Sequence, residues 1–185
     1  MQDILKQAKK IKLVIFDVDG VLTDGSLFFG DDGQEYKAFY ARDGLGIKLL
    51  QRTGVEVGVI TARNSKLVNH RMENLDIKHL YQGRLDKIAA FNDLINKLGI
   101  SADETAYAGD DVIDLPVMKK VGLAIAVQDA HPFVKKHAHW ITEHNGGRGA
   151  ARDICELIME AQGTLEEQLN TFVWIKKYKW NDKNE

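Results

Sequence analysis

Short apolar segments alternate with segments of helical periodicity along most of the chain, and this alternation restricts the possible folds more than any other feature. Five apolar runs have the character of buried strands, at 12–16, 55–60, 105–108, 123–127 and 140–142. Because these runs are largely continuous rather than alternating, they indicate strands that are covered on both faces. Strands of this kind between helices predict an α/β fold with a doubly wound parallel sheet and helices on both faces.

The segments between these runs have the apolar spacing of helices. The clearest has its apolar residues on one face and is followed by Gly99, a residue that commonly ends a helix. Asp43 is the expected N-cap of a second helix, and a third follows Ser65. The predicted helices cover 87–98, 45–52 and 65 to about 74, and the chain becomes helical again after 149.

Two segments depart from this alternation. Residues 27–40 hold two aromatic runs around Gly-Asp-Asp-Gly, a pattern that predicts a β-hairpin. Residues 164–185 are predicted to form a helical tail, whose basic and aromatic side chains would also suit an acidic lipid or a nucleic acid. We favour an amphipathic helix that rests on the chain's own oligomer. The remaining segment, 1–163, has the length of one domain with its own core.

The charge balance argues against several classes of partner. With 25 Lys and Arg against 27 Asp and Glu, the formal net charge is −2, so the basic surface that nucleic acids or anionic membranes attract is missing. No apolar stretch reaches the length of a membrane span, and the N-terminus lacks the apolar core of a secretory signal. The single cysteine, Cys155, excludes an internal disulfide and suits a reducing compartment. We therefore expect a cytoplasmic protein without nucleic-acid or membrane partners.

Polar residues stand where the predicted strands end. They are Asp17 and Asp19 after the first run, Thr61 after the second, Lys87 at the start of the long helix, and Asp110, Asp111 and Asp114 after the third run. In an open parallel sheet, the carboxyl ends of the strands face one crevice, so these side chains are expected to converge. Clustered carboxylates repel one another unless a cation neutralises them, and oxygen ligands alone favour Mg²⁺.

These residues also resemble a known set of motifs. The segment 17–23, Asp-Val-Asp-Gly-Val-Leu-Thr, is similar to the nucleophile motif of the haloacid dehalogenase (HAD) superfamily phosphatases. Thr61, Lys87 and the segment 109–114 resemble the second, third and fourth motifs of that superfamily, in the right order. Four motifs in register, each at a predicted strand end or helix start, are far more specific than any one of them. The resemblance implies a Rossmann-like sheet and a Mg²⁺-dependent phosphomonoester hydrolase.

The resemblance also implies a role for each catalytic residue. Asp17 would attack phosphorus and become an aspartyl phosphate, and Asp19 would protonate the leaving oxygen and later deprotonate water. Thr61 would donate a hydrogen bond to a phosphoryl oxygen, and Lys87 would balance the developing charge. If Asp17 and Asp19 continue an extended strand, their side chains lie on one face. The alternatives are that Thr61 is an ordinary helix cap and Lys87 a solvated first-turn lysine.

The metal ligands follow from the same resemblance. Asp17, Asp110 and the backbone carbonyl of Asp19 would bind Mg²⁺, while Asp114 or Asp111 would orient its waters and Lys87. For Asp111 the alternative is stronger, because an acidic residue is favourable at any helix start.

Substrate preference depends on the segments between the motifs. Many superfamily members carry a large cap domain there, whereas here the first gap holds the hairpin and one helix, and the second holds one helix and one strand. The chain therefore resembles the capless members, whose open sites a neighbouring subunit closes, and the resemblance implies a homotetramer. The hairpin would then be both a flap and an interface, since exposed aromatics mark contacts. Its alternative is packing on its own domain.

Within the capless group, the segments 41–48, 61–63, 81–83 and 145–150 resemble the phosphatases of 3-deoxy-D-manno-octulosonate 8-phosphate (KDO 8-phosphate). Arg42, Lys48, Arg63 and Arg71 are more cations than one phosphate needs, and a phosphorylated sugar acid carries a carboxylate as well, which the planar fork of arginine suits. The expected substrate-binding residues are Asp19, Tyr40, Ala41, Arg42, Asp43, Gly44, Lys48, Arg63, Arg71, Lys87 and Arg148. By this resemblance Arg148 reaches toward an adjacent subunit, whereas Arg71 has the alternative of a solvated surface residue.

The predicted function is therefore the hydrolysis of KDO 8-phosphate to KDO and phosphate, a step in lipopolysaccharide synthesis. A phosphatase of a nine-carbon, sialic-acid-type 9-phosphate is the closest alternative, because it needs the same cations for a carboxylate. A receiver-like phospho-binding signalling domain also uses strand-end Asp, Thr and Lys with Mg²⁺, but its phosphoacceptor does not follow the first strand. A non-catalytic scaffold would be expected to lack Asp17 or Asp19, and both are present.

Overall fold

Six parallel strands form the central sheet of the protein, in the order β5-β4-β1-β6-β7-β8. The structure is a computed structural model that describes residues 1–173. The strands are β1 Leu13–Phe16, β4 Glu56–Ile60, β5 His79–Tyr81, β6 Thr105–Gly109, β7 Leu123–Ala126 and β8 Trp140–Ile141. Because β1 pairs with both β4 and β6, the strand order reverses beside it, and this is where open α/β sheets bind ligands.

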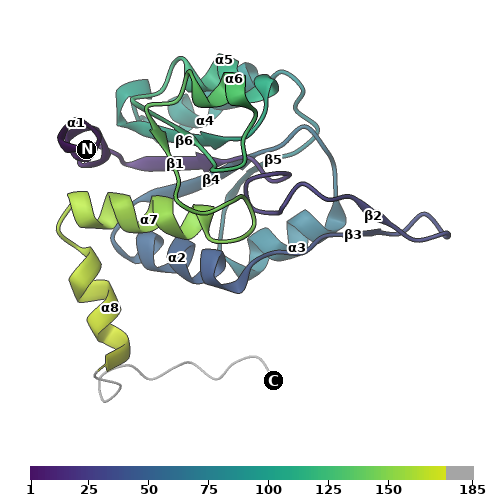
Figure 1. Ribbon diagram of the computed structural model, residues 1–185, viewed down its shortest axis with the longest axis horizontal. Helices are drawn as coiled ribbons and strands as arrows, with labels where there is room; N and C mark the ends of the chain where they lie inside the picture. The colour runs from purple at the N-terminus through teal and green to yellow at the C-terminus, as the bar shows by residue number, and fades with distance from the viewer. Residues whose placement is uncertain (174–185) are drawn as a thin grey trace.

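Helices cover both faces of this sheet, as predicted. Figure 1 shows α2, α3 and α7 on one side and α4, α5 and α6 on the other. The helices are α1 Gln2–Ala8, α2 Ala41–Arg52, α3 Lys66–Asn74, α4 Lys87–Leu98, α5 Leu115–Met118, α6 Pro132–Lys135, α7 Ala150–Ala161 and α8 Leu165–Val173. Two short 3₁₀ turns, Ala102–Glu104 and Val112–Asp114, precede β6 and α5.

The continuous apolar runs of the sequence form the centre of the core. Every residue of β1 and β7 is buried, because each strand has a helical layer above and below it. Fully burying a side chain such as Ile15 or Phe16 contributes about 1.5–3 kcal/mol relative to leaving it exposed. The strands end where these buried apolar runs end, and the polar residues named in the sequence analysis follow at those positions.

Helix α4 has the bounds that its periodicity predicts. Asp86 caps it by accepting a hydrogen bond from the backbone N–H of Ile88 at 3.1 Å. Gly99 ends it in the left-handed conformation, with a φ of 65° that L side chains rarely adopt. Lys87 is consequently held at the first position of a well-defined helix.

Helix α2 begins earlier than predicted, and Asp43 is not its N-cap. Tyr40 occupies that position, and Asp43 lies inside the first turn. The carboxylate of Asp43 instead accepts a hydrogen bond from the backbone N–H of Arg152, at 2.9 Å, in the first turn of α7. The expected cap therefore serves a different helix, which packs beside α2.

The predicted hairpin extends from the body of the molecule (Figure 1). Its strands β2, Phe28–Phe29, and β3, Glu35–Tyr36, pair antiparallel around the turn at 30–33. The side chains of Phe28 and Phe29 are more than half exposed. Between β1 and α4, the chain forms this hairpin, α2, β4, α3 and β5, without a large cap domain.

The C-terminal segment continues beyond α7 into α8, which projects away from the sheet in Figure 1. Residues 174–185 of the predicted tail, with its basic and aromatic run, lie outside the described residues. In residues 1–173, none of the helices combines the length and apolar character of a membrane span.

Candidate active site

A buried ion-pair group lies at the carboxyl ends of β1 and β6. The ammonium Nζ of Lys87 is 2.8 Å from Oδ2 of Asp17 and 2.6 Å from Oδ1 of Asp114. A lysine at the first position of a helix is disfavoured by the helix dipole, and its two carboxylate partners offset that effect. Lys87 is only 2% exposed, so it is not the solvated lysine of the alternative interpretation. Burial would lower the pKa of Lys87, but Asp114 and Asp17 together raise it above its ordinary value.

Asp114 is itself held in place by further hydrogen bonds, and it thereby positions Lys87. Its Oδ1 also accepts a hydrogen bond from the hydroxyl of Tyr107 at 2.7 Å, and its Oδ2 accepts one from the backbone N–H of Asp110 at 3.0 Å. Gly109 makes this packing possible, because a Cβ there would lie 2.5 Å from the Cβ of Asp114. Tyr107 was missed by sequence reasoning, although a hydroxyl in the middle of a buried strand signals a polar partner.

Three carboxylates of this region fit a divalent cation. Asp17, Asp110 and Asp114 each offer an oxygen, and these oxygens lie within 4.8 Å of one another. Burial and the charges of Asp114 and Asp17 raise the pKa of Asp110 to about 8. Burial and Asp114 likewise raise the pKa of Asp17 to about 6, although Lys87 opposes the shift. An all-oxygen donor set with excess negative charge is the kind that Mg²⁺ prefers.

The loop after β1 approaches this cluster closely. Gly20 has a φ of 86°, and a Cβ on it would lie 2.2 Å from Oδ2 of Asp110. Glycine is therefore required for the loop to pass beside Asp110. The interpretation that Asp17 and Asp19 share an extended strand is wrong, because β1 ends at Phe16 and a turn follows. Oδ1 of Asp17 accepts a hydrogen bond from the backbone N–H of Val18 at 2.7 Å, within that turn.

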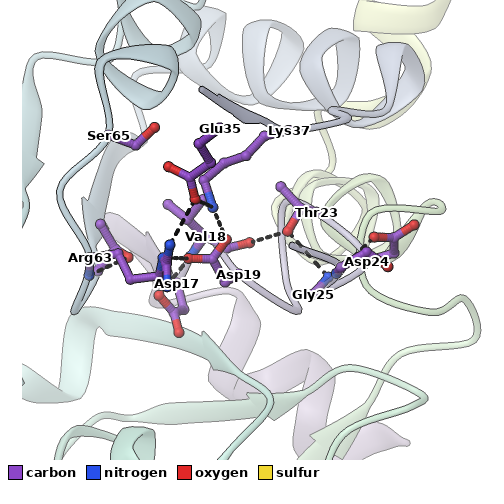
Figure 2. Close-up of polar contacts among 12 residues, drawn as sticks. Asp17, Val18, Asp19, Thr23, Asp24, Gly25, Glu35, Lys37, Arg63 and Ser65 are labelled. Carbon is purple, nitrogen blue, oxygen red and sulfur yellow. Dashed lines mark hydrogen bonds and ion pairs between the residues drawn. The ribbon is translucent and has the colours of Figure 1, made fainter. Parts of the chain in front are cut away.

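The carboxylate of Asp19 lies outside the group of three aspartates and meets the hairpin. Oδ1 of Asp19 forms a close ion pair with Nζ of Lys37, and its Oδ2 lies 3.8 Å from Nε of Arg63. Figure 2 shows Glu35 and Lys37 extending together toward Asp19 and Arg63. Oε1 of Glu35 accepts a hydrogen bond from Arg63 at 2.9 Å. Glu35 and Lys37 were not predicted; charged residues two apart in an aromatic hairpin were the available signal.

Thr61 directly follows β4, at the carboxyl end of the strand, and is 2% exposed. It is not the cap of the following helix, because Ser65 takes that position before α3. The backbone N–H of Thr61 donates a hydrogen bond to the carbonyl of Tyr81 at 2.9 Å. The carbonyl of Thr61 accepts one from the backbone N–H of Arg84 at 3.0 Å. The hydroxyl of Thr61 accepts a hydrogen bond from the backbone N–H of Arg63 at 3.5 Å.

The expected substrate-binding segment 40–44 forms the start of α2. Arg42 is exposed and lies over the ring of Tyr40, with 6.0 Å between the guanidinium carbon and the ring centre. Arg71 is not a solvated surface residue, because it lies over the ring of Phe39 at 5.7 Å beside Gly44. A Cβ on Gly44 would lie 2.3 Å from a guanidinium nitrogen of Arg71. Ala41 is exposed at the first position of the same helix.

Two expected substrate-binding residues are engaged elsewhere in the chain. Lys48 pairs closely with Asp76, which lies between the end of α3 and the start of β5, whereas Asp17 follows the carboxyl end of β1. Arg148 lies 2.9 Å from Asp24, and its segment packs against the chain's own loop at 20–24. Within residues 1–173 of a single chain, Lys48 and Arg148 therefore form ion pairs with Asp76 and Asp24 and none with Asp17.

Asp111 follows its alternative interpretation. Its carboxylate accepts a hydrogen bond from the backbone N–H of Val112 at 2.7 Å and so caps the 3₁₀ turn that begins there. Of the two candidates for orienting Lys87, only Asp114 contacts it.

Fold and site together define the class of protein. A parallel sheet with an aspartate beyond its first strand, beside a buried lysine and further aspartates, is the arrangement of the HAD hydrolases. Residues 77–154 match the haloacid dehalogenase-like hydrolase family.

Comparison with known proteins narrows the class. The chain is 50% identical over 165 residues to the KDO 8-phosphate phosphatase KdsC of Escherichia coli K12, covering 89% of this chain and 88% of that protein. The chain therefore belongs to the KDO 8-phosphate phosphatase family. The receiver-like alternative finds no support in this likeness.

Solved structures of the family superpose closely on the fold. The crystal structure of the Yersinia pestis KDO 8-phosphate phosphatase has a TM-score of 0.88 at 48% identity, over 89% of each chain. The Moraxella catarrhalis phosphatase, in complex with magnesium, phosphate and KDO, has a TM-score of 0.91 at 41% identity, over 93% of this chain and 99% of that one.

Proposed function

We propose that the protein hydrolyses KDO 8-phosphate to KDO and phosphate with Mg²⁺ as its cofactor, in the cytoplasm, as a step of lipopolysaccharide synthesis. The observation that carries this proposal is the buried contact of Asp17 with Lys87 beside Asp110, in a chain that is 50% identical to KdsC. The arrangement presents one carboxylate, held at both oxygens, to an incoming phosphoryl group.

Asp17 is the proposed nucleophile. One of its oxygens forms a bond to phosphorus while the bond from phosphorus to the sugar oxygen breaks, and an aspartyl phosphate results. Asp19, beside the opening of the site, donates a proton to the departing oxygen and takes one from the water that hydrolyses the intermediate. Hydrogen bonds from Val18 and Lys87 fix the carboxylate of Asp17 before the reaction, which reduces the entropy lost on reaching the transition state.

Lys87, Thr61 and Asp114 support this step. Lys87 already faces Asp17, so it can balance the negative charge that the phosphoryl oxygens bring. Thr61 is proposed to donate a hydrogen bond to one of those oxygens. Asp114 keeps Lys87 in position, and its acceptor sites are occupied by Lys87, Tyr107 and backbone N–H groups.

The group of carboxylates would hold the metal. We propose that Asp17, Asp110 and the backbone carbonyl of Asp19 bind Mg²⁺, with Asp114 behind them. When bound, Mg²⁺ supplies positive charge that neutralises both the carboxylates and the phosphoryl oxygens.

Recognition of the sugar acid is proposed to depend on cations around the opening. Arg63 lies 3.8 Å from Asp19, Arg42 lies in the first turn of α2, and Arg71 of α3 lies over the ring of Phe39. Lys48 and Arg148, which point elsewhere in their own chain, are proposed to serve the site of a neighbouring subunit in a homotetramer. The more than half exposed aromatics of the hairpin support such an assembly.

The test is phosphate release from KDO 8-phosphate, a nine-carbon keto-acid 9-phosphate and simple sugar phosphates, with and without EDTA. We expect KDO 8-phosphate to be preferred, EDTA to abolish turnover, and Asp17→Asn to lower kcat by about 10³-fold or more. Asp103→Asn, an exposed aspartate before β6, is the control and should keep full activity. Equal turnover of all substrates would overturn the specificity, and an active Asp17→Asn enzyme would overturn the mechanism.

A further inference from the structure

Four charged side chains form a closed group between the hairpin and the catalytic loop, which we call the hairpin charge cluster. It consists of Asp19, Glu35, Lys37 and Arg63 (Figure 2). Nζ of Lys37 pairs closely with Asp19 and lies 3.2 Å from Oε1 of Glu35. The same Oε1 accepts the hydrogen bond from Arg63 at 2.9 Å. Glu35 thus bridges both cations of the cluster.

The burial of the cluster contrasts with the rest of the hairpin. The side chain of Lys37 is 1% exposed and that of Glu35 is 17% exposed, although the neighbouring Tyr36 is more than half exposed. Glu35 of β3 and Lys37 just beyond it both extend toward Asp19 and Arg63, as Figure 2 shows. Burial would raise the pKa of Glu35, but the hydrogen bonds from Lys37 and Arg63 outweigh it and keep the pKa below its ordinary value. Glu35 is therefore an ionised carboxylate held between Lys37 and Arg63, the two cations that contact Asp19.

We propose that Glu35 occupies, in the free enzyme, the place on Arg63 that the carboxylate of the substrate takes when it binds. This inference deepens the proposed function and rests on it. The guanidinium of Arg63 prefers a planar, charged acceptor, and Glu35 and a keto-sugar acid present the same group. Exchanging one carboxylate for another keeps Arg63 paired throughout.

The contacts of Glu35 keep the free-energy cost of this exchange small. When Glu35 leaves Arg63, its carboxylate keeps the ammonium of Lys37 as a partner, so no buried charge is left alone. The competition nevertheless lowers the apparent affinity for the substrate, because Arg63 is free in only a fraction of the molecules. A phosphate ester without a carboxylate does not displace Glu35 and is not subject to this competition.

The variant Glu35→Gln tests the proposal, because it keeps the size of the side chain and removes its charge. We expect the KM for KDO 8-phosphate to fall about fivefold, as for the loss of one partly exposed ion pair, while the KM for ribose 5-phosphate is unchanged. Calorimetry should show about fivefold tighter binding of free KDO, which requires no turnover. Equal shifts for both esters, or no shift for either, would overturn the proposal.

Asp31→Asn is the matched control, because it removes the same charge from the exposed tip of the same hairpin. It should leave both KM values and the affinity for KDO unchanged, and the solution mass of each variant should equal that of the wild type. A wild-type enzyme that does not release phosphate from KDO 8-phosphate would overturn the proposed function itself. An active wild type with an unaltered ratio of KM values in Glu35→Gln would overturn only the role of Glu35.

Discussion

Asp43 lies in the first turn of α2 and is 3% exposed. Burial raises its pKa to about 6, although hydrogen bonds from the backbone of Arg152 and Gly149 oppose the shift. One of its oxygens, Oδ2, has no hydrogen-bond partner among the described residues. One oxygen of Asp43 therefore accepts a hydrogen bond from α7, and the other is buried without a partner in residues 1–173. The free energy of burying this carboxylate between α2 and α7 depends on pH.

The sign of this dependence follows from the direction of the pKa shift. Because the folded-state pKa of Asp43 exceeds the ordinary value of 3.8, the folded protein binds the proton more tightly than the unfolded chain does. The contribution of Asp43 to stability is therefore fully present below about pH 4 and is lost as the pH rises through about 6. A shift of this size corresponds to up to about 3 kcal/mol.

Asp43→Asn should remove this dependence while keeping an oxygen for Arg152. We expect the variant to gain stability relative to the wild type between pH 4 and pH 6, because an amide does not ionise. Urea unfolding at several pH values and one fixed chain concentration measures the difference. With Asp103→Asn as the reference variant, a stability difference that is constant with pH would contradict the assignment.

At the scale of elements, the loop after β1 determines how the carboxylates meet. Gly20 and Gly54 both have a positive φ, of 86° and 89°, which L side chains rarely adopt. A Cβ at Gly20 would collide with Asp110, whereas a Cβ at Gly54, after α2, would meet no atom within 4 Å. Comparing substitutions at these two glycines therefore distinguishes the effect of backbone strain from the effect of contact with Asp110.

Gly20→Ala and Gly54→Ala should destabilise the protein through the same backbone strain, by about 1–2 kcal/mol each. Only Gly20→Ala should also lose activity, by about a hundredfold, because Asp110 must move away from Asp17. Thermal unfolding and kcat/KM measured side by side decide the matter. Equal activity in the two variants would show that the approach of the loop to Asp110 is unimportant.

At the scale of the whole molecule, the hairpin extends from a sheet that is otherwise covered on both faces. Leu27, Phe28, Phe29 and Tyr36 are 46%, 56%, 61% and 55% exposed. Isolated two-stranded hairpins are marginally stable in water, so an exposed aromatic hairpin is expected to gain stability from contact with another chain. This expectation agrees with the proposed homotetramer.

Phe29→Ser should weaken the proposed assembly and lower kcat/KM by about tenfold, because an open site loses the residues that a neighbour contributes. Light scattering across a range of concentrations reports the mass. The control is Ile141→Ser on the edge strand β8, where the side chain is 38% exposed. A fully active monomer of the wild type would contradict the assembly.

The residues at the strand ends show how much of the fold and the site could be predicted from the sequence. The continuous apolar runs predicted the parallel sheet, and the rule that such strands end at one crevice predicted that Asp17, Thr61, Lys87 and Asp110 converge. The structure brings Asp17, Lys87 and Asp110 together. The bounds of α4 were also predicted, because its periodicity and Gly99 are local signals. Two local inferences failed: the cap assigned to Asp43, and the extended strand through Asp19.

The sequence by itself determined the class of fold, the order of the motifs and the chemistry of the carboxylates, because these depend on residues close together in the chain. Only the tertiary structure decided that Asp43 caps α7, across 109 positions, and that Lys37 pairs with Asp19, across 18. Those contacts depend on how α2, α7 and the hairpin pack. Short-range periodicity carries no information about which distant polar group a buried charge will meet.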